Sequence, residues 1–333
     1  MKNKIIRLND LQKPKEYSVV SLFSGAGGLD MGFENSGCKT IWANDIDADA
    51  CETHRSWSDA EVVCGDIGKI GVENIPESDI VLGGFPCQGF SLAGPRKIDD
   101  KRNSLYRYFV KLLETNQPYA FVAENVKGIL TLGDGEIITA IIEDFSEKGY
   151  DVYPNLVNAA DYGVPQDRWR VLMIGFRKDL CIKTFEFPEP SDYKATLYDV
   201  LKDIPESDAH DICNASYSSR FMSRNRKRNW NQVSYTIPAM AKQVPLHPSS
   251  PDMIKESADV WKFGDNGNTR RFSWQECAAI QTFPPGMYFS GNLTSKYKQI
   301  GNAVPVKLSE VVASAVMEKL NKCFNNRNMS AEV

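Results

Sequence analysis

The sequence predicts an α/β fold, in which a mixed, mostly parallel sheet carries helices on both faces and a smaller, irregular domain follows. Two observations support this prediction. From Tyr17 to about residue 178, short apolar runs alternate with segments whose apolar residues recur at helical spacing. Beyond residue 178 the alternation stops, and Pro, Ser and Asn become frequent. Strands that alternate with helices favour parallel pairing, because each helix returns the chain to the edge where the strand began.

The individual elements follow from the same patterns. Strands are predicted over 17–23, 40–45, 61–66, 79–84, 120–126 and 169–176. Helices are predicted over 29–37, 47–57, from Leu105 onward, and over 136–149, 273–283 and 306–320. We therefore expect one domain over 1–178 that is completed by 290–324, a second domain over 179–289, and a flexible tail over 325–333.

Composition limits the class of protein. Apolar residues make up 42% of the 333 residues and charged residues 25%, as in ordinary soluble proteins. No run approaches the roughly 20 apolar residues of a membrane span, and the basic N-terminal segment lacks the apolar stretch of a secretion signal. The eight cysteines form no CxxC pair, so we expect reduced cytoplasmic thiols and no metal. With a net charge of −4, any polyanionic partner must be held by a local basic patch.

A glycine-rich turn, FSGAGG over 23–28, follows the first predicted strand. Glycines there let a ligand approach the backbone, and the next helix offers free N–H groups. Asp45 ends the second strand, where nucleotide-binding folds place a carboxylate for ribose hydroxyls, and Asp66 ends the third. A nicotinamide fingerprint would have glycine where this chain has Asp30. The pattern favours an adenosine without a pyrophosphate, although a plain turn with a solvated Asp66 also fits it.

The stretch GGFPCQGFS over 83–91 places a thiol on the turn after the fourth strand, at the same sheet edge. A free cysteine is usually a small buried apolar residue. Cys87, however, stands beside the expected adenosine pocket, and a thiolate is a strong nucleophile. Glu124 ends the next strand, where a buried carboxylate must be paired or take part in chemistry. Both are candidate catalytic residues, and a salt-bridged structural role is the alternative for Glu124.

The stretch RFMSRNRKRNW over 220–230 contains cations and no acidic residue. Arginine pairs with guanine in the major groove and lysine suits phosphate. Arg220, Arg224, Arg226, Lys227 and Arg228 are therefore candidate contacts for a nucleic acid. Arg224 and Arg226 would share one face of an extended strand. A solvated charged surface is the alternative interpretation of this stretch.

Eight stretches occur in order along the chain: FSGAGGLDMGF, NDID, GDI, GGFPCQGFS, NSLY, AENVKG, QDRWRV and YKQIGNAVP. Together they resemble the ordered motifs of the cytosine-5 DNA methyltransferases. The resemblance covers 18–178 and 270–318, and it implies a Rossmann-like, S-adenosylmethionine-dependent fold with a target-recognition domain in between. Two departures occur: Asp45 stands where the family often has Glu, and Ala93 stands where a small polar residue is frequent, which leaves open what aids base flipping.

The resemblance implies S-adenosylmethionine as the cofactor and S-adenosylhomocysteine as its product. The residues that it assigns to the cofactor site are Phe23, Ser24, Gly25, Ala26, Gly27, Gly28, Leu29, Asp45, Ile46, Asp66, Ile67, Pro86, Leu105, Asn302, Ala303 and Val304.

The resemblance also implies a covalent reaction. Cys87 adds to C6 of cytosine, Glu124 hydrogen-bonds or protonates N3, and a base removes the C5 proton after methyl transfer. Arg168 and Arg170 are assigned to the base carbonyl and to support of the site, with a charged surface strand as the alternative.

DNA contacts are expected near the nucleophile too. C5 and C6 are inaccessible in stacked DNA, so the base must be flipped out. The segment 90–102 would close over the base, or it would be a solvated connection. The contacts assigned here are Gln88 and Ser91.

The basic stretch resembles recognition segments of bacterial restriction-modification enzymes, so we expect a short double-stranded site containing G and C. The expected protein is a cytoplasmic, nucleoid-associated monomer. A cognate endonuclease would act on the same DNA site without binding this chain. An RNA (tRNA) cytosine-5 methyltransferase and a catalytically silent DNA-binding relative remain alternatives. The long middle domain counts against the first, and intact Cys87 and Glu124 against the second. Asp30 counts against a nicotinamide dehydrogenase.

Overall fold

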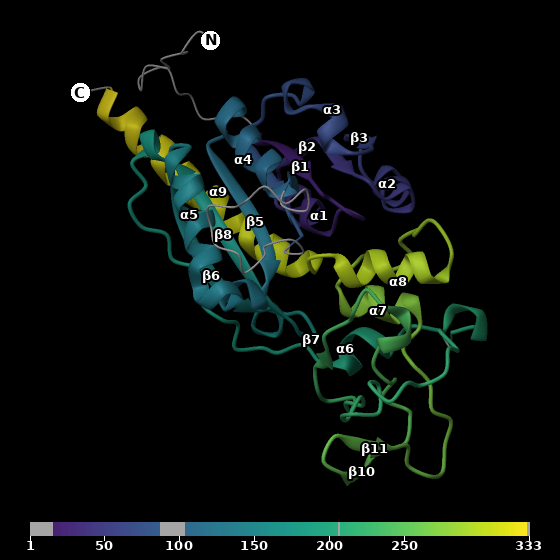
Figure 1. Cartoon of the computed structure of the whole chain (residues 1–333). Coiled ribbons are helices and arrows are strands. Elements are labelled where there is room, and N and C mark those ends of the chain that lie inside the picture. The colour runs from purple at the N-terminus through teal and green to yellow at the C-terminus, as the bar shows by residue number, and fades with distance from the viewer. Residues whose placement is uncertain (1–15, 87–103, 206, 332–333) are drawn as a thin grey trace.

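A seven-stranded sheet forms the centre of the molecule (Figure 1). A computed structural model of the chain describes residues 16–86, 104–205 and 207–331. The sheet contains β1 (Ser18–Leu22), β2 (Lys39–Asp45), β3 (Glu61–Cys64), β4 (Ile80–Gly83), β5 (Ala120–Val126), β6 (Tyr150–Asn158) and β8 (Trp169–Arg177). Their spatial order is β3-β2-β1-β4-β5-β8-β6. All six predicted strands are present.

The sheet is mixed, as predicted. β3, β2, β1, β4 and β5 pair in parallel, whereas β8 runs antiparallel to both β5 and β6. β6 is absent from the predicted strands, because its sequence YDVYPNLVN contains Pro154 and a proline counts against an interior strand. The structure explains the proline, since β6 is an edge strand.

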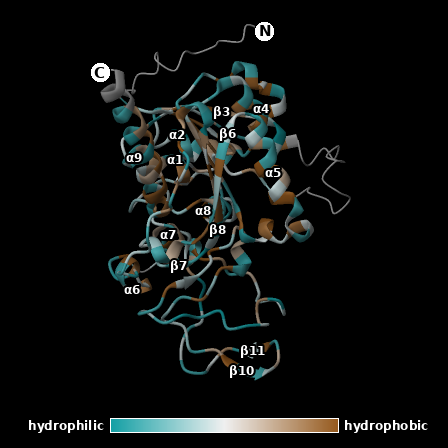
Figure 2. Cartoon of the chain, turned by 90° about the vertical axis from the view of Figure 1, so that its left-hand side faces the viewer, coloured by the Kyte–Doolittle hydropathy of each residue, from teal (hydrophilic) through white to brown (hydrophobic). Residues whose placement is uncertain are grey.

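Helices cover both faces of the sheet, as predicted. On one face, α1 (Gly28–Asn35) and α9 (Val306–Ala331) pack with alternate strand residues such as Val19 and Leu82. On the other face, α4 (Ser104–Asn116) and α5 (Glu136–Glu147) pack with Phe121. Both helices carry hydrophilic and hydrophobic residues (Figure 2). The shorter helices α2 (Ala48–Arg55) and α3 (Ile67–Ile70) follow β2 and β3.

Helix α9 continues beyond the end predicted near residue 320. Phe324 is buried, and its ring centroid lies 5.1 Å from that of Tyr119. Residues 325–331, predicted as a flexible tail, therefore prolong a helix that is anchored by packing. The stretch Leu293–Asn326 is long and apolar enough to cross a membrane by composition. Its apolar residues within α9, however, belong to the core beside the sheet.

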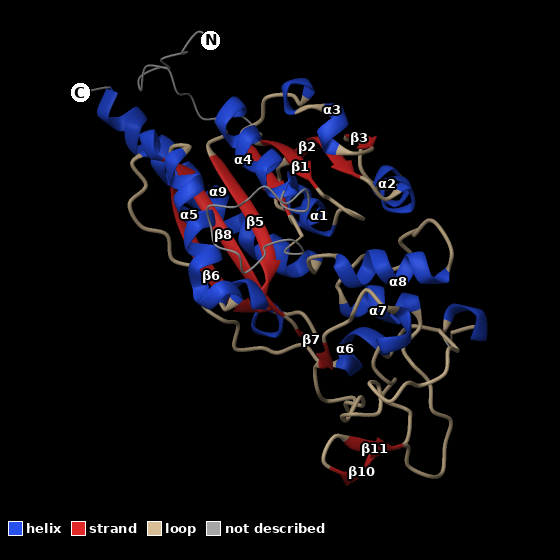
Figure 3. Cartoon of the chain, in the orientation of Figure 1, coloured by secondary structure: helices blue, strands red, loops and turns tan. Residues whose placement is uncertain are grey.

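Residues 179–289, which we call the loop-rich region, contain little regular structure (Figure 3). The elements are α6 (Leu197–Leu201), β9 (Ser234–Tyr235), β10 (Ile254–Ser257), β11 (Val260–Lys262) and α7 (Trp274–Ile280). β9 pairs with β7 (Gln166–Asp167), and a capping box between Ser273 and Glu276 begins α7, at the start of the helix predicted over 273–283. An unpredicted helix, α8 (Leu293–Asn302), joins a core cluster with α6, α7 and residues of the turn after β1.

Candidate active site

A cavity of about 560 Å³ lies where β1, β2, β3, β4 and β5 end. Parallel strands bring their carboxyl ends to one sheet edge, which is where α/β folds bind ligands. Glu124 lines this cavity. The predicted cofactor residues that line it are Phe23, Ser24, Gly25, Gly28, Leu29, Asp45, Ile46, Asp66, Ile67, Pro86, Leu105, Asn302, Ala303 and Val304.

The turn after β1 holds an unusual backbone conformation at the cavity. Phe23 has a φ of +57°, which is uncommon for a residue with a side chain, and Gly25 has the same φ. The Asp45 carboxylate holds this turn in place. Its Oδ2 accepts a hydrogen bond from the Gly25 N–H at 2.8 Å, and its Oδ1 accepts one from the Asp47 N–H at 2.9 Å. Asp45 therefore shapes the cavity as well as offering oxygens to a ligand.

Ala26 and Gly27, predicted as cofactor residues, face α2 rather than the cavity. The Trp57 indole donates a hydrogen bond to the Ala26 carbonyl at 3.0 Å. A Cβ on Gly27 would lie 2.3 Å from the Trp57 ring, and the φ of +82° there also favours glycine. Trp57 in turn stacks on His54, with ring centroids 4.8 Å apart. Neither residue lines the cavity, because a tight turn presents only part of its backbone to one side, and their cofactor role stays a prediction.

The end of the cavity over β2 and β3 combines apolar and acidic groups. The side chain of Asp66 begins α3, since its Oδ1 accepts a hydrogen bond from the Gly68 N–H at 2.9 Å. Ile46 is 74% exposed, and Ile67 is buried. An exposed apolar side chain near an exposed carboxylate suits a flat heterocycle that carries an amine.

Glu124 and Arg170 form an ion pair at the end of the cavity over β5. Arg170 Nε lies 2.7 Å from Glu124 Oε1, and the two side chains are only 12% and 13% exposed. A buried charge requires such a partner. A Cβ on Gly84 would lie 3.3 Å from Glu124 Oε2, so the glycine leaves room for the carboxylate beside the turn after β4.

Cys87, the predicted nucleophile, lies outside the described residues, as do Gln88, Ser91, Ala93 and the segment 90–102. The described chain reaches Pro86, which lines the cavity. The Asn125 side-chain amide donates a hydrogen bond to the Phe85 carbonyl at 3.0 Å. Asn125 therefore ties the end of β5 to the turn that leads to Cys87. The sequence predicted no role for Asn125, although it directly follows Glu124.

Arg168 is fully buried and does not line the cavity. Its guanidinium donates hydrogen bonds to the carbonyls of Ile237, Gly301 and Ala303 at 3.1, 2.8 and 2.9 Å. Burial and the nearby Arg170 lower the pKa of Arg168. This placement agrees with the predicted supporting role. It does not agree with the predicted contact to the base carbonyl, because the side chain is enclosed by its three backbone partners.

The wall opposite the strand ends comes from the turn between α8 and α9. A Cβ on Gly28 would lie 2.5 Å from the Val304 carbonyl, so α1 and this turn approach closely only with glycine there. Lys298 of α8 also lines the cavity, and its Nζ lies 2.6 Å from Asp47 Oδ2. Lys298 belongs to the stretch YKQIGNAVP, but no role was predicted for it.

The basic stretch of the loop-rich region does not form the predicted extended strand. Arg220 and Arg224 are exposed, whereas Arg226 is buried. The Arg226 guanidinium donates hydrogen bonds to the carbonyls of Phe221 and Arg220, both at 2.9 Å. This side chain satisfies backbone carbonyls inside the region, which counts against the predicted DNA contact of Arg226.

The last two cations of the stretch are paired with acidic residues. Lys227 Nζ bonds the Asp252 carboxylate. Arg228 lies 3.6 Å from an Asp167 oxygen, and its guanidinium carbon lies 4.2 Å from the Tyr235 ring centroid. Arg220 and Arg224 are therefore the cations of this stretch that present exposed side chains.

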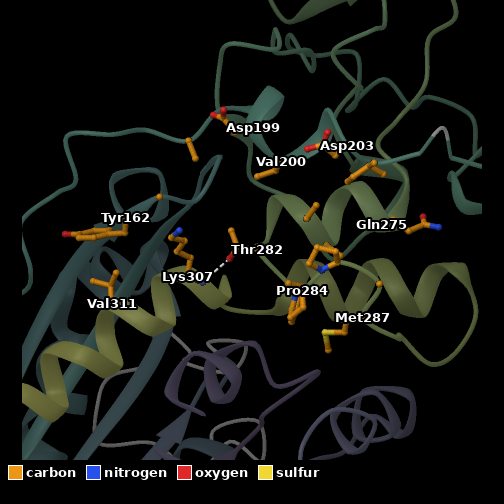
Figure 4. A pocket seen from close by; sticks show the side chains of 18 of the residues that line it. Tyr162, Asp199, Val200, Asp203, Gln275, Thr282, Pro284, Met287, Lys307 and Val311 are labelled. Carbon is orange, nitrogen blue, oxygen red and sulfur yellow. Dashed lines mark hydrogen bonds between the residues drawn. The ribbon is translucent and has the colours of Figure 1, made fainter. Parts of the chain in front are cut away.

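A larger cavity of about 1030 Å³ lies between the sheet and the loop-rich region (Figure 4). Tyr162 and Lys307 face it from one side, and Val200 and Met287 from the other. None of the predicted site residues within the described ranges lines it. The described residues also contain no group of three His, Cys, Asp or Glu that could hold a metal ion. The smaller cavity at the strand ends is therefore the candidate active site.

The fold and this cavity define an α/β protein that binds a ligand at its strand ends, next to a buried carboxylate–arginine pair. The family model for C-5 cytosine-specific DNA methylases matches residues 17–318. The chain belongs to this family, and it is a methyltransferase.

Relatives agree with this assignment over nearly the whole chain. The Type II methyltransferase M.FnuDI of Fusobacterium nucleatum is 43% identical over 327 residues, which cover 91% of this chain and 94% of the relative. The Type II methyltransferase M.BsuRI of Bacillus subtilis is 42% identical and covers 90% of this chain and 79% of its own. The solved S. pombe Dnmt2 methyltransferase is 15% identical, with a TM-score of 0.67 over 92% of this chain and 100% of its own. That last likeness concerns the fold alone.

Proposed function

We propose that this methyltransferase modifies C5 of a flipped-out cytosine in a short double-stranded DNA site, with Cys87 and Glu124 acting on the base. One observation carries the proposal: the cavity joins the Glu124–Arg170 pair to the residues expected to hold an adenosine. The hydrogen bond from Asn125 to Phe85 supports it, because this bond ties the turn before Cys87 to the strand that carries Glu124.

S-adenosylmethionine, which the family implies, fits the cavity in size and chemistry. A volume of about 560 Å³ is in the range of small-molecule sites. Asp45 offers carboxylate oxygens to ribose hydroxyls, and Asp66 offers them to an adenine amine. Phe23 and Ile46 offer apolar surface to the heterocycle. When bound, the cofactor supplies an electrophilic methyl group, and S-adenosylhomocysteine is released.

The protein side chains must make C5 of cytosine nucleophilic. The Cys87 thiolate adds to C6, and the new S–C6 bond gives C5 the character of an enamine. Glu124 hydrogen-bonds or protonates N3 and so stabilises the charge that develops on the ring. Arg170 holds the Glu124 carboxylate in place. After C5 is methylated, a base removes its proton, the S–C6 bond breaks, and Cys87 is released as the thiolate.

The loop-rich region is the proposed DNA-recognition part of the chain. Arg220 and Arg224 are exposed there, and Gln88 and Ser91 would contact the DNA near the base. Relatives named Type II methyltransferases support a protective role in a restriction-modification system. In this role the protein acts as a monomer on bacterial cytoplasmic DNA. A cognate endonuclease would act on the same site without binding the chain.

The test is bisulfite sequencing of DNA from bacteria that express the chain, with Cys87→Ala as the matched control. Wild-type protein should protect the cytosine of one short sequence, and the variant should protect none, because the thiolate acts in the chemical step. A duplex with 5-fluorocytosine at that position should form a covalent adduct with the wild type alone, since fluorine blocks the elimination. Turnover by the alanine variant would remove Cys87 from the mechanism. Modified cytosine in tRNA but not in DNA would favour the RNA alternative.

A further inference from the structure

We propose that Asp30 binds the α-ammonium group of S-adenosylmethionine and so holds the amino-acid end of the cofactor. This inference rests on the proposed function, because it requires that the cavity at the strand ends binds this cofactor. It gives a ligand-binding role to a carboxylate that none of the predicted contacts includes.

The first observation is an unsatisfied carboxylate at the cavity. Asp30 stands in the first turn of α1, is fully buried, and belongs to the cavity lining. Neither carboxylate oxygen has a partner at full hydrogen-bond geometry among the described residues, and the groups that lie near enough to lower its pKa are the Ser21 hydroxyl and the Asp30 N–H, both uncharged. The nearby Ser21 side chain, which also lines the cavity, stabilises the charge only in part. Burying an ionised carboxylate without a partner costs several kcal/mol, so the position calls for a cation.

The described residues do not supply that cation. Lys298 lines the same cavity but is bound to Asp47, and Arg170 is bound to Glu124. The charged group that acts on Asp30 through space is the Asp45 carboxylate of β2. Burial first, and Asp45 in addition, raise the pKa of Asp30 to about 7. A positively charged group of the ligand would compensate the negative charge of the Asp30 carboxylate.

The strand order places Asp30 where the amino-acid arm of the cofactor is expected. Asp66 follows β3 and Asp45 ends β2 on one side of β1. Pro86 follows β4 and Glu124 lies near the end of β5 on the other side. A sulfonium has three arms. With adenosine over β3 and β2 and the methyl group directed to β4 and β5, the amino-acid arm lies over β1 and the start of α1. Asp30 meets its ammonium there, and N–H groups of the first helical turn suit its carboxylate.

This arrangement couples cofactor binding to the loss of a proton. Below about pH 7 the empty site holds Asp30 in its protonated form, and the proton must leave before the carboxylate can pair with an ammonium. Affinity for a ligand with the amino-acid arm should therefore fall as pH drops below 7, by up to about tenfold per pH unit. Affinity for an adenosine ligand without that arm should not follow this trend.

The test compares two ligands by titration calorimetry with the full chain. S-adenosylhomocysteine carries the amino-acid arm, whereas 5′-methylthioadenosine keeps the adenosine and the sulfur and lacks it. Asp30→Asn should weaken S-adenosylhomocysteine at least tenfold at pH 8 and leave 5′-methylthioadenosine within about twofold. Asp45→Asn is the matched control, and it should weaken both ligands in similar proportion because both contain the ribose.

A measurement without ligand shows whether the variant folds. Asp30→Asn should raise the Tm of the free protein at pH 8, and the gain should shrink toward pH 5. The sign follows because the folded pKa lies above the usual value of 3.8, so ionisation of Asp30 destabilises the native state as pH rises. Equal weakening of both ligands by Asp30→Asn, or of neither, overturns the assignment of Asp30 and leaves the cofactor in place. If wild-type protein binds neither ligand, the proposed cofactor fails and this inference fails with it.

Discussion

Charged side chains serve different purposes in the strand-end cavity and in the loop-rich region. In the cavity, Asp30, Asp45 and Asp66 line space that a ligand can fill. In the loop-rich region, several cations are bound to the protein itself. Arg271 is buried and donates hydrogen bonds to the carbonyls of Cys213 and Ala215 at 2.9 and 2.8 Å. Arg270 holds Glu276 with two bonds of 2.8 Å.

The difference follows from what stabilises each part. Strand pairing and two apolar cores stabilise the sheet, so its edge is free to carry groups that serve a ligand. The loop-rich region has few strands and helices to satisfy its backbone carbonyls, and buried carbonyls need donors. Arginine offers five N–H donors in one side chain. A run of arginines in an irregular region therefore indicates internal support as readily as it indicates DNA binding.

The largest effect that this comparison predicts concerns Arg226. Arg226→Ala should lower the free energy of unfolding by about 3 kcal/mol, because it leaves the buried carbonyl of Phe221 and the partly buried carbonyl of Arg220 without this donor. Arg224→Ala is the matched control, since Arg224 is exposed and should change stability by less than about 0.5 kcal/mol. Urea denaturation of the two variants measures both values. Equal losses of stability in the two variants would show that the bonds of Arg226 to backbone carbonyls do not support the loop-rich region.

An effect of intermediate size is expected on the stability of the native state at low pH. His54 lies beside the turn after β1 and His247 lies in the loop-rich region, and burial lowers the pKa of each to about 4. The unfolded chain takes up these protons near pH 6.5, so the stability of the native state should fall as pH drops from about 6.5 to 4. His54→Gln or His247→Gln should each flatten this decline by up to about 1.4 kcal/mol per pH unit.

Thermal or urea denaturation between pH 4 and 7 measures the decline. His247 faces Glu276, which raises its pKa, and Arg270, which lowers it. A decline that His247→Gln leaves unchanged would mean that the folded protein accepts the proton and pairs it with Glu276.

The smallest effect concerns the exposed arginines. Arg224→Ala should flatten the dependence of DNA affinity on salt by about one unit of log–log slope, because one phosphate contact is lost. Lys227→Ala should change that slope less, since Lys227 is bound to Asp252. Fluorescence titration of a cognate duplex at several salt concentrations measures both slopes. A loss confined to the cognate duplex, of about 1–3 kcal/mol, would instead indicate that Arg224 contacts a guanine edge.

The sheet and most of its cavity could be predicted, because parallel strands bring their ends together whatever the details of the loops. Phe23, Asp45 and Ile67 line the cavity for this reason. Ala26 and Gly27 do not line it, because the direction in which a turn residue faces depends on a contact with Trp57 that is distant in sequence.

Long-range packing also explains the other failures. Arg224 and Arg226 are indistinguishable in the sequence, and only the burial of carbonyls around Arg226 separates them. Helix α8 is polar in sequence, and its partners in α6 and α7 come from an irregular segment whose path no local pattern indicates. Asp30 was noticed only as a departure from a glycine motif, because its burial depends on the packing of α1 against the sheet.

The three carbonyls held by Arg168 have a consequence for exchanging target specificity between enzymes. Ile237 belongs to the loop-rich region, whereas Gly301 and Ala303 belong to the end of α8 and the turn that follows it, beside the cavity. A chimera that imports a foreign segment over 179–289 replaces one of these partners and keeps the other two. Such a graft should transfer sequence preference without loss of turnover only when the imported segment presents a carbonyl to Arg168 at the position of Ile237.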